Sequence, residues 1–390
     1  MNSINHANGY LMAGDRELGK IEDGILTEKN SMNEKYLPLF FKNKNNADMW
    51  LETRVIDKGR INSRKLKKAL LLKDKDDIST ALYVYGATIT DNYWIKPYNE
   101  DISYKDIAFT KNSFDLLALE GDLTIFAYSK PERTPELTNT GSYEKCWKRE
   151  EGNWYLYKKG SNGDFFAELF AYRLGEFLGC NMAKYELDSG YIKSLNFTEG
   201  KYNLEPMAHL IWDNDDYLDN YDLLMSMDSK LAKQYIDIIL MDTLIFNTDR
   251  HTYNYGFLRS QETGEIKSMA PNFDNNQAYG ATNTGFKLKP QEDLLLRFFS
   301  ELVTERKIQF DLPEINFNEV FKIVDDIDLP VPEIKAAIKE YLPLRYEQLE
   351  KVKEKVPRRD LNELQKEIEV QKTNIEASGR ISKKSVERCR

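Results

Sequence analysis

Two acidic residues and one amide are the strongest candidates for chemistry in this chain. Asp249 and Asn254 lie in the segment NTDRHTYN, and Asp274 follows in APNFDNN. Transfer of a phosphoryl group from ATP needs one carboxylate to orient the hydroxyl nucleophile. It also needs an amide and a second carboxylate to hold Mg²⁺. We therefore expect Asp249 to act as the catalytic base, and Asn254 and Asp274 to bind the metal.

The segment between these residues predicts how they are brought together. Residues 255–259 and 266–269 have the composition of strands, and turn residues at 262–265 separate them. Since a hairpin brings its outer ends together, Asn254 and Asp274 are expected at the same end of it. Asp and Asn are also ordinary turn residues, which is the better interpretation of any one of them alone. The complete arrangement favours chemistry.

The loop that carries Asp249 follows a helix predicted over residues 229–247. This helix is expected to begin at Ser229 as its cap and is apolar nearly all round toward its end, which is typical of a buried helix. Within the loop, Arg250 is a further catalytic candidate that could neutralise an acid or a phosphate. His251 is expected to donate a hydrogen bond that fixes the loop.

A lysine that contacts ATP, and an acid that holds this lysine, are expected upstream. Residues 145–149 and 154–158 are predicted to form a hairpin, and Lys158 ends its second strand. Because side chains alternate along a strand, only one of Lys158 and Lys159 can face the nucleotide, and we favour Lys158. Glu168, early in the next predicted helix, could pair with it. The alternative is that these charges are simply solvent-exposed.

The phosphate loop is expected immediately before this hairpin, in the sequence TNTGS at residues 138–142. Backbone amides and hydroxyls could cradle phosphate there, with Thr140, Gly141 and Ser142 as the ATP contacts. A single glycine in this segment is equally compatible with a surface turn, and that alternative stays open.

The adenine site is expected between the sheet and the helical part of the chain, at SLNFT, residues 194–198. The backbone there could pair with adenine, with Asn196 and Phe197 as the contacting residues. Phe197 either lines the site or belongs to the core of a hinge, and the sequence does not separate these two interpretations.

The composition restricts the class of protein. The chain has 390 residues, of which 41% are hydrophobic, enough for a sizeable core and more than one domain. A formal charge of -9 argues against direct nucleic-acid binding, which depends on neutralising phosphates. Neither a signal peptide nor an apolar run of ~20 residues is visible, and the cysteine spacing fits neither zinc nor disulfides. We expect a cytoplasmic protein that does not associate with membranes.

An α+β protein with four regions is expected. Residues 1–130 form an N-terminal α+β region of unknown role, which includes a basic amphipathic helix over residues 60–73. A sheet-rich region covers residues 131–198, a mostly helical region covers 199–356, and a charged helical tail covers 357–390.

The motifs NTDRHTYN and FDNN, the lysine–glutamate pair and TNTGSYEK together resemble the HipA-like serine/threonine kinases over about residues 130–350. The resemblance implies a two-lobed, protein-kinase-like fold with a small sheet-rich N-lobe and a mostly helical C-lobe. It implies ATP and Mg²⁺ as cofactors, and the roles given above for Asp249, Asn254, Asp274, Lys158 and Glu168. It also implies autophosphorylation of a hydroxyl in the phosphate loop, for which Thr138 is nearest, with Thr140 and Ser142 close by.

The resemblance also implies partners. HipA toxins are typically paired with a helix-turn-helix antitoxin, and they can target an aminoacyl-tRNA synthetase. A Ser/Thr acceptor on such an enzyme or on a translation factor is therefore expected, together with an antitoxin. Two other functions stay open. A kinase for small molecules or lipids would carry the same motifs, because a fold does not specify its acceptor. A nucleotide-binding regulator with little turnover is the third.

Overall fold

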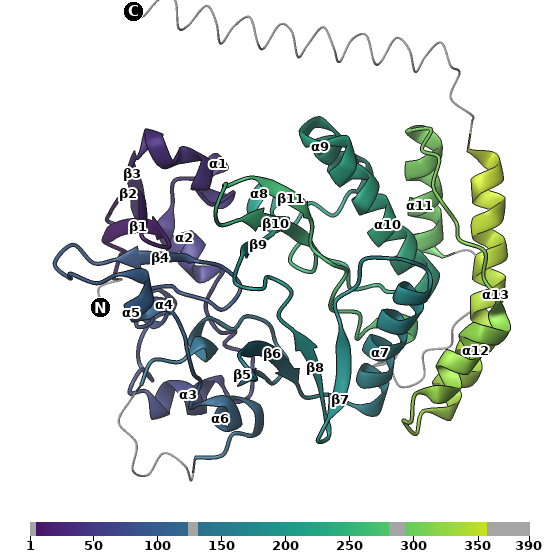
Figure 1. The fold of residues 1–390 in the computed structure, drawn as a ribbon, viewed down its shortest axis with the longest axis horizontal. Coiled ribbons are helices and arrows are strands. Elements are labelled where there is room, and N and C mark those ends of the chain that lie inside the picture. The colour runs from purple at the N-terminus through teal and green to yellow at the C-terminus, as the bar shows by residue number, and fades with distance from the viewer. Residues whose placement is uncertain (1–4, 124–131, 281–292, 357–390) are drawn as a thin grey trace, which may run out of the picture.

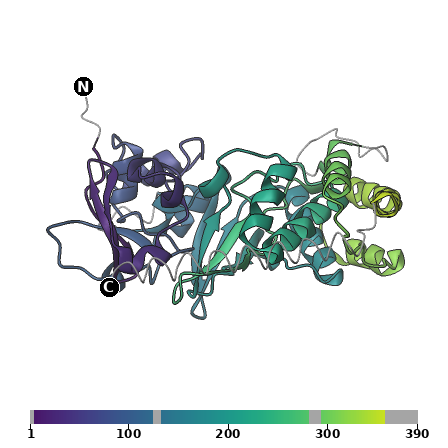
Figure 2. The ribbon, with the colours of Figure 1, turned by 90° about the horizontal axis from the view of Figure 1, so that it is seen from above.

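Figures 1 and 2 show the computed structural model of the chain, which describes residues 5–123, 132–280 and 293–356. The molecule is elongated: a sheet with short helices forms one end, two further sheets lie in the middle, and long helices form the other end. The strands form three antiparallel sheets. The expected mixed α+β class is therefore confirmed.

The N-terminal sheet joins β1 (Gly9–Ala13), β2 (Arg16–Glu22), β3 (Ile25–Lys29) and β4 (Tyr93–Lys96) in the order β3-β2-β1-β4. Its buried side chains, such as Leu11 and Ile21, pack against Phe41 and Trp50 of the short helices. Those helices are η1 (Ser31–Tyr36), α1 (Phe40–Asn43), α2 (Ala47–Glu52), α3 (Ser63–Ala69), α4 (Asp77–Leu82), α5 (Tyr104–Ile107) and α6 (Asp115–Glu120).

The basic helix predicted over residues 60–73 is shorter than expected. It corresponds to α3, which ends at Ala69, and Leu71 then adopts a φ of 59°. Because a left-handed backbone cannot continue a right-handed helix, the helix stops before this residue. Leu66 is buried against the core of this region, so one face of α3 packs inward.

The central sheet holds β5 (Lys145–Glu150), β6 (Asn153–Lys158), β7 (Tyr185–Asp188) and β8 (Tyr191–Leu195) in the order β5-β6-β8-β7. The predicted hairpin is present, with a tighter turn than expected. Glu151 and Gly152 both have positive φ, 49° and 88°, the pattern of the two-residue turn that matches strand twist. Helix α7 (Asn162–Phe177) packs beside this sheet and starts at a capping box formed by Ser161 and Asp164.

The third sheet places β9 (Tyr202–Pro206), β10 (Gly256–Ser260) and β11 (Ile266–Met269) in the order β11-β10-β9. The hairpin expected between Asn254 and Asp274 is present as β10 and β11. Strand β9 was not expected. It pairs with β10 from across a long connection, and no local pattern predicts such a partner.

Long helices form the other end of the molecule (Figure 1). Helix α10 (Ser229–Ile245) is buried all round from Ile238 to Ile245, as its apolar composition toward its end predicts. The prediction that Ser229 caps it was wrong. Asp228 is the cap, and its carboxylate accepts from the backbone N–H of Lys230 at 2.8 Å. The remaining helices after β9 are α8 (Ala208–Ile211), α9 (Tyr217–Met227), η4 (Ala278–Gly280), α11 (Leu294–Glu305), α12 (Phe317–Asp326) and α13 (Pro332–Lys355).

Two large hydrophobic clusters stabilise the chain. One contains buried residues between Ala7 and Leu137, and the other contains Leu39 together with buried residues between Phe165 and Val356. The region boundaries near residues 130, 198 and 356 stay predictions. The expected helical tail, residues 357–390, lies outside the described residues. Among the helices that the structure describes, none is both long and apolar enough to cross a membrane.

Candidate active site

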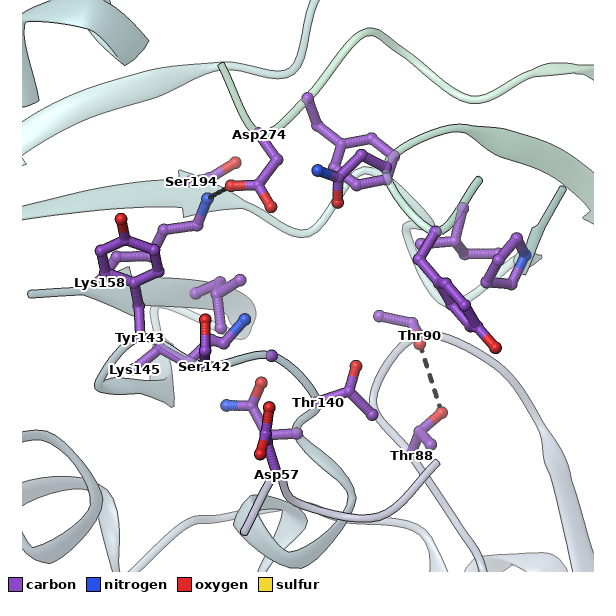
Figure 3. Close-up of a pocket in the computed structure, with 18 of the residues that line it drawn as sticks. Asp57, Thr88, Thr90, Thr140, Ser142, Tyr143, Lys145, Lys158, Ser194 and Asp274 are labelled. Carbon is purple, nitrogen blue, oxygen red and sulfur yellow. Dashed lines mark hydrogen bonds and ion pairs between the residues drawn. The ribbon is translucent and has the colours of Figure 1, made fainter. Parts of the chain in front are cut away.

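A cavity of about 770 Å³ opens between the N-terminal region, the central sheet and the loop after α10. This volume is within the range of roughly 300–1,000 Å³ that is usual for small-molecule sites. Every residue predicted for catalysis, ATP or metal lines the cavity, with the exception of Arg250. Figure 3 shows Lys158 and Asp274 on one side of it and Thr88 and Thr90 of the N-terminal region on the other.

The ammonium of Lys158 binds two carboxylates at the end of β6. Its Nζ lies 2.8 Å from Oε1 of Glu168 and 2.5 Å from Oδ1 of Asp274. Burial alone would lower the pKa of Lys158, but Asp274 and Glu168 hold this pKa well above its usual value. The ammonium of Lys159 instead lies 2.9 Å from Oε2 of Glu120 and is about half exposed. Of the two lysines, Lys158 is the one that pairs with α7.

Glu168 joins the lysine to the segment that carries Asp274. The side chain of Glu168 is 1% exposed, and its Oε2 accepts from the backbone N–H of Asn275 at 2.8 Å. Its position follows from the packing of α7, where the rings of Phe166 and Phe170 on the same helix are stacked and fully buried. A single carboxylate thereby connects β6, α7 and the loop after β11.

Asp274 occupies an unusual backbone position. Its φ is 61°, a left-handed conformation that costs about 1–3 kcal/mol and is common at functional sites. Its N–H donates to the hydroxyl of Tyr185 at 3.0 Å. Burial alone would raise the pKa of Asp274, but Lys158 and Lys145 outweigh it and lower this pKa to about 2. The carboxylate is therefore ionised at neutral pH, as a metal ligand must be.

Asp249 and Asn254 are held together in the loop after α10. The side-chain NH₂ of Asn254 donates to the backbone carbonyl of Asp249 at 2.9 Å. Its amide oxygen is then the atom suited to a cation. Burial raises the pKa of the Asp249 carboxyl, and nearby Asp274 raises it further. His251 fixes the loop both as donor and as acceptor, because its backbone N–H donates to the carbonyl of Asp249 at 2.9 Å and its Nδ1 accepts from the N–H of Tyr253 at 3.3 Å.

Arg250 is a buried structural residue, which corrects its expected place among the catalytic groups. Its Nε and Nη2 donate to the two oxygens of Asp242, each at 2.8 Å. Its Nη1 donates to the carbonyls of Asn254 and Phe273, each at 2.6 Å, and its Nη2 also donates to Asn272 and Asn275. Every N–H donor is thus occupied, which leaves none for a phosphate. Of its two expected roles, Arg250 fulfils the neutralisation of an acid.

Thr138 belongs to a helix rather than to the exposed part of the segment expected to be the phosphate loop. Thr138 ends the short helix η3 (Pro135–Thr138), and its buried hydroxyl donates to the carbonyl of Ala87 at 2.6 Å. Thr140, Gly141 and Ser142 are exposed at the cavity. The autophosphorylation predicted at Thr138 would therefore require this buried hydroxyl to be released first, whereas Thr140 and Ser142 are accessible.

Gly141 is required by the path of this loop. Its φ is 101°, and a Cβ there would lie 2.3 Å from Nζ of Lys145. The loop therefore passes directly over Lys145, which also lines the cavity (Figure 3). Burial lowers the pKa of Lys145 to about 8.

The segment expected to meet adenine borders the cavity. Phe197 lines it, and its ring centroid lies 5.6 Å from that of Phe273. Asn196 also lines it, and its Oδ1 accepts from both the N–H and the hydroxyl of Thr198. Phe197 also packs against the large hydrophobic core, so both interpretations of this residue stay open. The contact with adenine itself stays a prediction.

Lys145, Thr88 and Thr90 are cavity residues that the sequence did not identify. Lys145 pairs with Lys158 across the β5–β6 ladder, so the two side chains emerge on the same face. The register of the predicted hairpin therefore places Lys145 beside Lys158. Thr88 and Thr90 come from the N-terminal region, and their hydroxyls lie 3.4 Å apart. No local signal marks these two residues, since only the tertiary fold brings them to the cavity.

The oxygen donors of the cavity are of the kind that Mg²⁺ accepts. Within residues 5–123, 132–280 and 293–356, no group of three or more His, Cys, Asp and Glu side chains is arranged to hold an ion. Asp274 and Asn254 supply one carboxylate and one amide to the cavity. Few protein oxygens are typical of Mg²⁺, which takes its remaining ligands from water and from substrate phosphates.

Comparison with known proteins supports the fold. No family model and no curated protein matches the sequence. Among solved structures, the chain is similar to the toxin–antitoxin system HipA, HipB and its operator DNA complex of Shewanella oneidensis MR-1. The TM-score is 0.52 at 11% identity, over 90% of this chain and 100% of that chain. It is also similar to the proinflammatory kinase CtkA of Helicobacter pylori, with a TM-score of 0.42 at 20% identity over 54% of this chain and 94% of that one. The likeness to HipA extends over most of the chain, which therefore has a HipA-like fold.

Proposed function

We propose that this protein is a HipA-like serine/threonine protein kinase that depends on Mg²⁺ and ATP. In this proposal, residues 131–198 form the N-lobe and residues 199–356 the C-lobe of a two-lobed kinase. The observation that carries the proposal is the convergence of Lys158, Glu168 and Asp274 in one bonded cluster, in the same cavity as Asp249 and Asn254.

Opposite pKa shifts distinguish the roles of the two aspartates. The raised pKa of Asp249 makes it the better proton acceptor, and the pKa of about 2 keeps Asp274 ionised. Where the pKa values of two carboxylates in one site are shifted apart in this way, one carboxylate commonly acts as acid or base and the other stabilises charge. Asp249 orients the acceptor hydroxyl and takes its proton, whereas Asp274 holds the metal together with Asn254.

The cations of the cavity suit the phosphates of ATP. Lys158 is oriented by Glu168, and Lys145 lies beside it under the exposed phosphate loop. Mg²⁺, when bound by Asp274 and Asn254, supplies positive charge that stabilises the charge developing on the transferred phosphoryl group. Asp274 and Asn254 would hold the metal, and the ammonium of Lys158, oriented by Glu168, would contact the phosphates.

The proposal extends to the partners of the protein. The similar HipA was solved in a complex with HipB and operator DNA. By analogy, we propose a helix-turn-helix antitoxin as a partner, and a Ser or Thr of an aminoacyl-tRNA synthetase or a translation factor as the acceptor. Autophosphorylation at Thr140 or Ser142 would add about -1.5 to -2 charges beside the nucleotide and would oppose ATP binding.

The experiment that tests this function identifies the acceptor class. The purified protein is incubated with Mg²⁺ and ATP labelled at the γ-phosphate, together with a bacterial lysate separated into protein, lipid and small-molecule fractions. The proposal predicts label on Ser or Thr of protein, either of this chain or of a lysate protein. Label only in the lipid or small-molecule fraction would replace the protein kinase with another kinase. ATP binding without transfer to any fraction would indicate a non-catalytic regulator.

A further inference from the structure

A residue of the N-terminal region holds the phosphate loop. Arg60 lies between α2 and α3 and is 1% exposed. Its Nη1 donates to the carbonyl of Asn139 at 2.9 Å, and its Nη2 donates to the carbonyl of Lys145. These two carbonyls flank residues 140–144, so one guanidinium connects both ends of the loop.

A buried carboxylate reinforces this connection. Glu136 is 0% exposed and lies 3.7 Å from Nη2 of Arg60. One of its oxygens accepts from the backbone N–H of Trp147 at 2.7 Å, and the other accepts from the side chain of Asn139 at 2.9 Å. Because Asn139 precedes the loop and Trp147 lies in β5 after it, Glu136 joins the same two sides that Arg60 joins.

The exposed part of the loop depends on these buried supports. Thr140, Gly141 and Ser142 face the cavity, and Gly141 passes over the ammonium of Lys145. The backbone of Lys145 is fixed by Arg60 at its carbonyl. The position of the lysine and the path of the loop above it therefore depend on the same guanidinium.

We propose that Arg60 is a positioning residue for the phosphate loop, so that the N-terminal region forms part of the nucleotide site. The inference rests on the proposed function, because it assumes that the loop meets the phosphates of ATP. Arginine suits this task since its planar guanidinium presents several N–H donors in a fixed fork, whereas the ammonium of lysine is a compact charge. Arg60 does not itself line the cavity, and it acts through the loop.

The main test variant is Arg60→Met combined with Glu136→Gln. Removing Arg60 alone would leave the carboxylate of Glu136 buried without its cation, and such unpaired buried charges are strongly destabilising. The double change removes both charges, and the amide oxygen of the introduced glutamine still accepts from the N–H of Trp147. The NH₂ of Asn139 loses its acceptor, so Glu136→Gln alone is measured beside the double variant as its reference. A second variant, Arg60→Lys, keeps a positive charge beside Glu136 but cannot reproduce the fork that reaches both carbonyls.

The matched control is Arg259→Met combined with Glu205→Gln. Arg259 and Glu205 form another buried pair, 3.0 Å apart and 3% and 1% exposed. Arg259 likewise donates to backbone carbonyls, those of Leu37 and Lys35. Neither residue lines the cavity. The control therefore perturbs stability through the same chemistry without contact with the phosphate loop.

Calorimetric titration of each protein with Mg²⁺-ATP and with adenosine separates a loss of phosphate contacts from a general loss of structure. A merely structural role of Arg60 would weaken both ligands alike. The proposal predicts that Arg60→Met/Glu136→Gln lowers ATP affinity roughly tenfold while adenosine affinity changes less than about twofold, since only the phosphate contacts are disturbed. The control should keep the wild-type ratio of the two affinities.

An unchanged ratio of ATP to adenosine affinity in a folded Arg60→Met/Glu136→Gln protein would overturn the proposal. If that protein does not fold, as judged by circular dichroism, Arg60→Lys decides by the same ratio: a fall supports the proposal and a wild-type ratio overturns it. If the wild-type protein itself binds no ATP, the proposed kinase function fails, which is distinct from failure of the role assigned to Arg60.

Discussion

Replacing Arg250 with methionine should lower both the stability of the fold and the rate of phosphate transfer. The two losses can be measured separately. The substitution leaves Asp242, which is 0% exposed, without the cation that binds both of its oxygens at 2.8 Å. Breaking a buried pair from one side costs about 3–5 kcal/mol. The same change removes the bonds to the carbonyls of Asn254 and Phe273, each at 2.6 Å. It therefore releases the segments that carry both proposed metal ligands.

Urea unfolding and phosphate transfer are the two measurements for this prediction. Arg250→Met should lower the free energy of unfolding by about 3–5 kcal/mol. The folded fraction should transfer phosphate on the order of a hundredfold more slowly, because small displacements of positioned groups are costly in catalysis. The control is Arg250→Met/Asp242→Leu, since replacing both partners of a buried pair with apolar residues is often nearly neutral.

The double variant tests whether Arg250 positions the site independently of its effect on stability. It should regain much of the stability without regaining transfer, because the carbonyls of Asn254 and Phe273 still lack their donor. Wild-type transfer by Arg250→Met/Asp242→Leu would show that Arg250 does not position the site. A wild-type unfolding midpoint for Arg250→Met would show that the buried pair does not stabilise the fold as argued.

Three further predictions follow from the cavity and its surroundings. Lys158→Ala should lower ATP affinity, whereas Lys159→Ala should change it less than about twofold because that ammonium forms an exposed pair with Glu120. Equal losses in a binding titration would contradict this assignment. Gly141→Ala should weaken ATP binding, since an L side chain is strained at this φ of 101° and its Cβ would displace the ammonium of Lys145, and wild-type affinity would show that the loop has another path. Burial lowers the pKa of His209 from 6.5 to about 3, so the unfolded chain takes up a proton that the folded protein does not. The contribution of neutral His209 to the free energy of unfolding, fully present above pH 6.5, should therefore be lost as the pH falls toward 3, by about 1.4 kcal/mol per pH unit. His209→Phe should remove this contribution between pH 7 and pH 5 in urea unfolding, and an unchanged slope would contradict it.

Local patterns in the sequence predict the strands and helices that carry the site. The alternation of strand side chains separated Lys158 from Lys159, and the hairpin of residues 255–269 placed Asn254 and Asp274 at the same end. The same reasoning on strand register would have found Lys145 opposite Lys158. The start of η3 also had a local signal, because Thr134 caps it and Pro135 occupies its first turn.

Long-range packing explains what the sequence did not predict. Arg250 stands beside Asp249 in the loop, but its partner Asp242 lies on α10, and only the buried geometry shows that its donors are fully used. Arg60, Thr88 and Thr90 reach the proposed phosphate loop or the cavity from far earlier in the chain. No periodicity or turn signal records such contacts, since they depend on how the N-terminal region packs on the central sheet.

The most direct test of the central claim compares the wild-type protein with Asp249→Asn, a substitution of nearly the same shape. Both are incubated with Mg²⁺ and ATP labelled at the γ-phosphate, in the presence of lysate protein, and ATP binding is measured in parallel. The account predicts that Asp249→Asn binds ATP with wild-type affinity but transfers label at least about a hundredfold more slowly, the usual contribution of a general base. Transfer by Asp249→Asn at the wild-type rate would contradict the account.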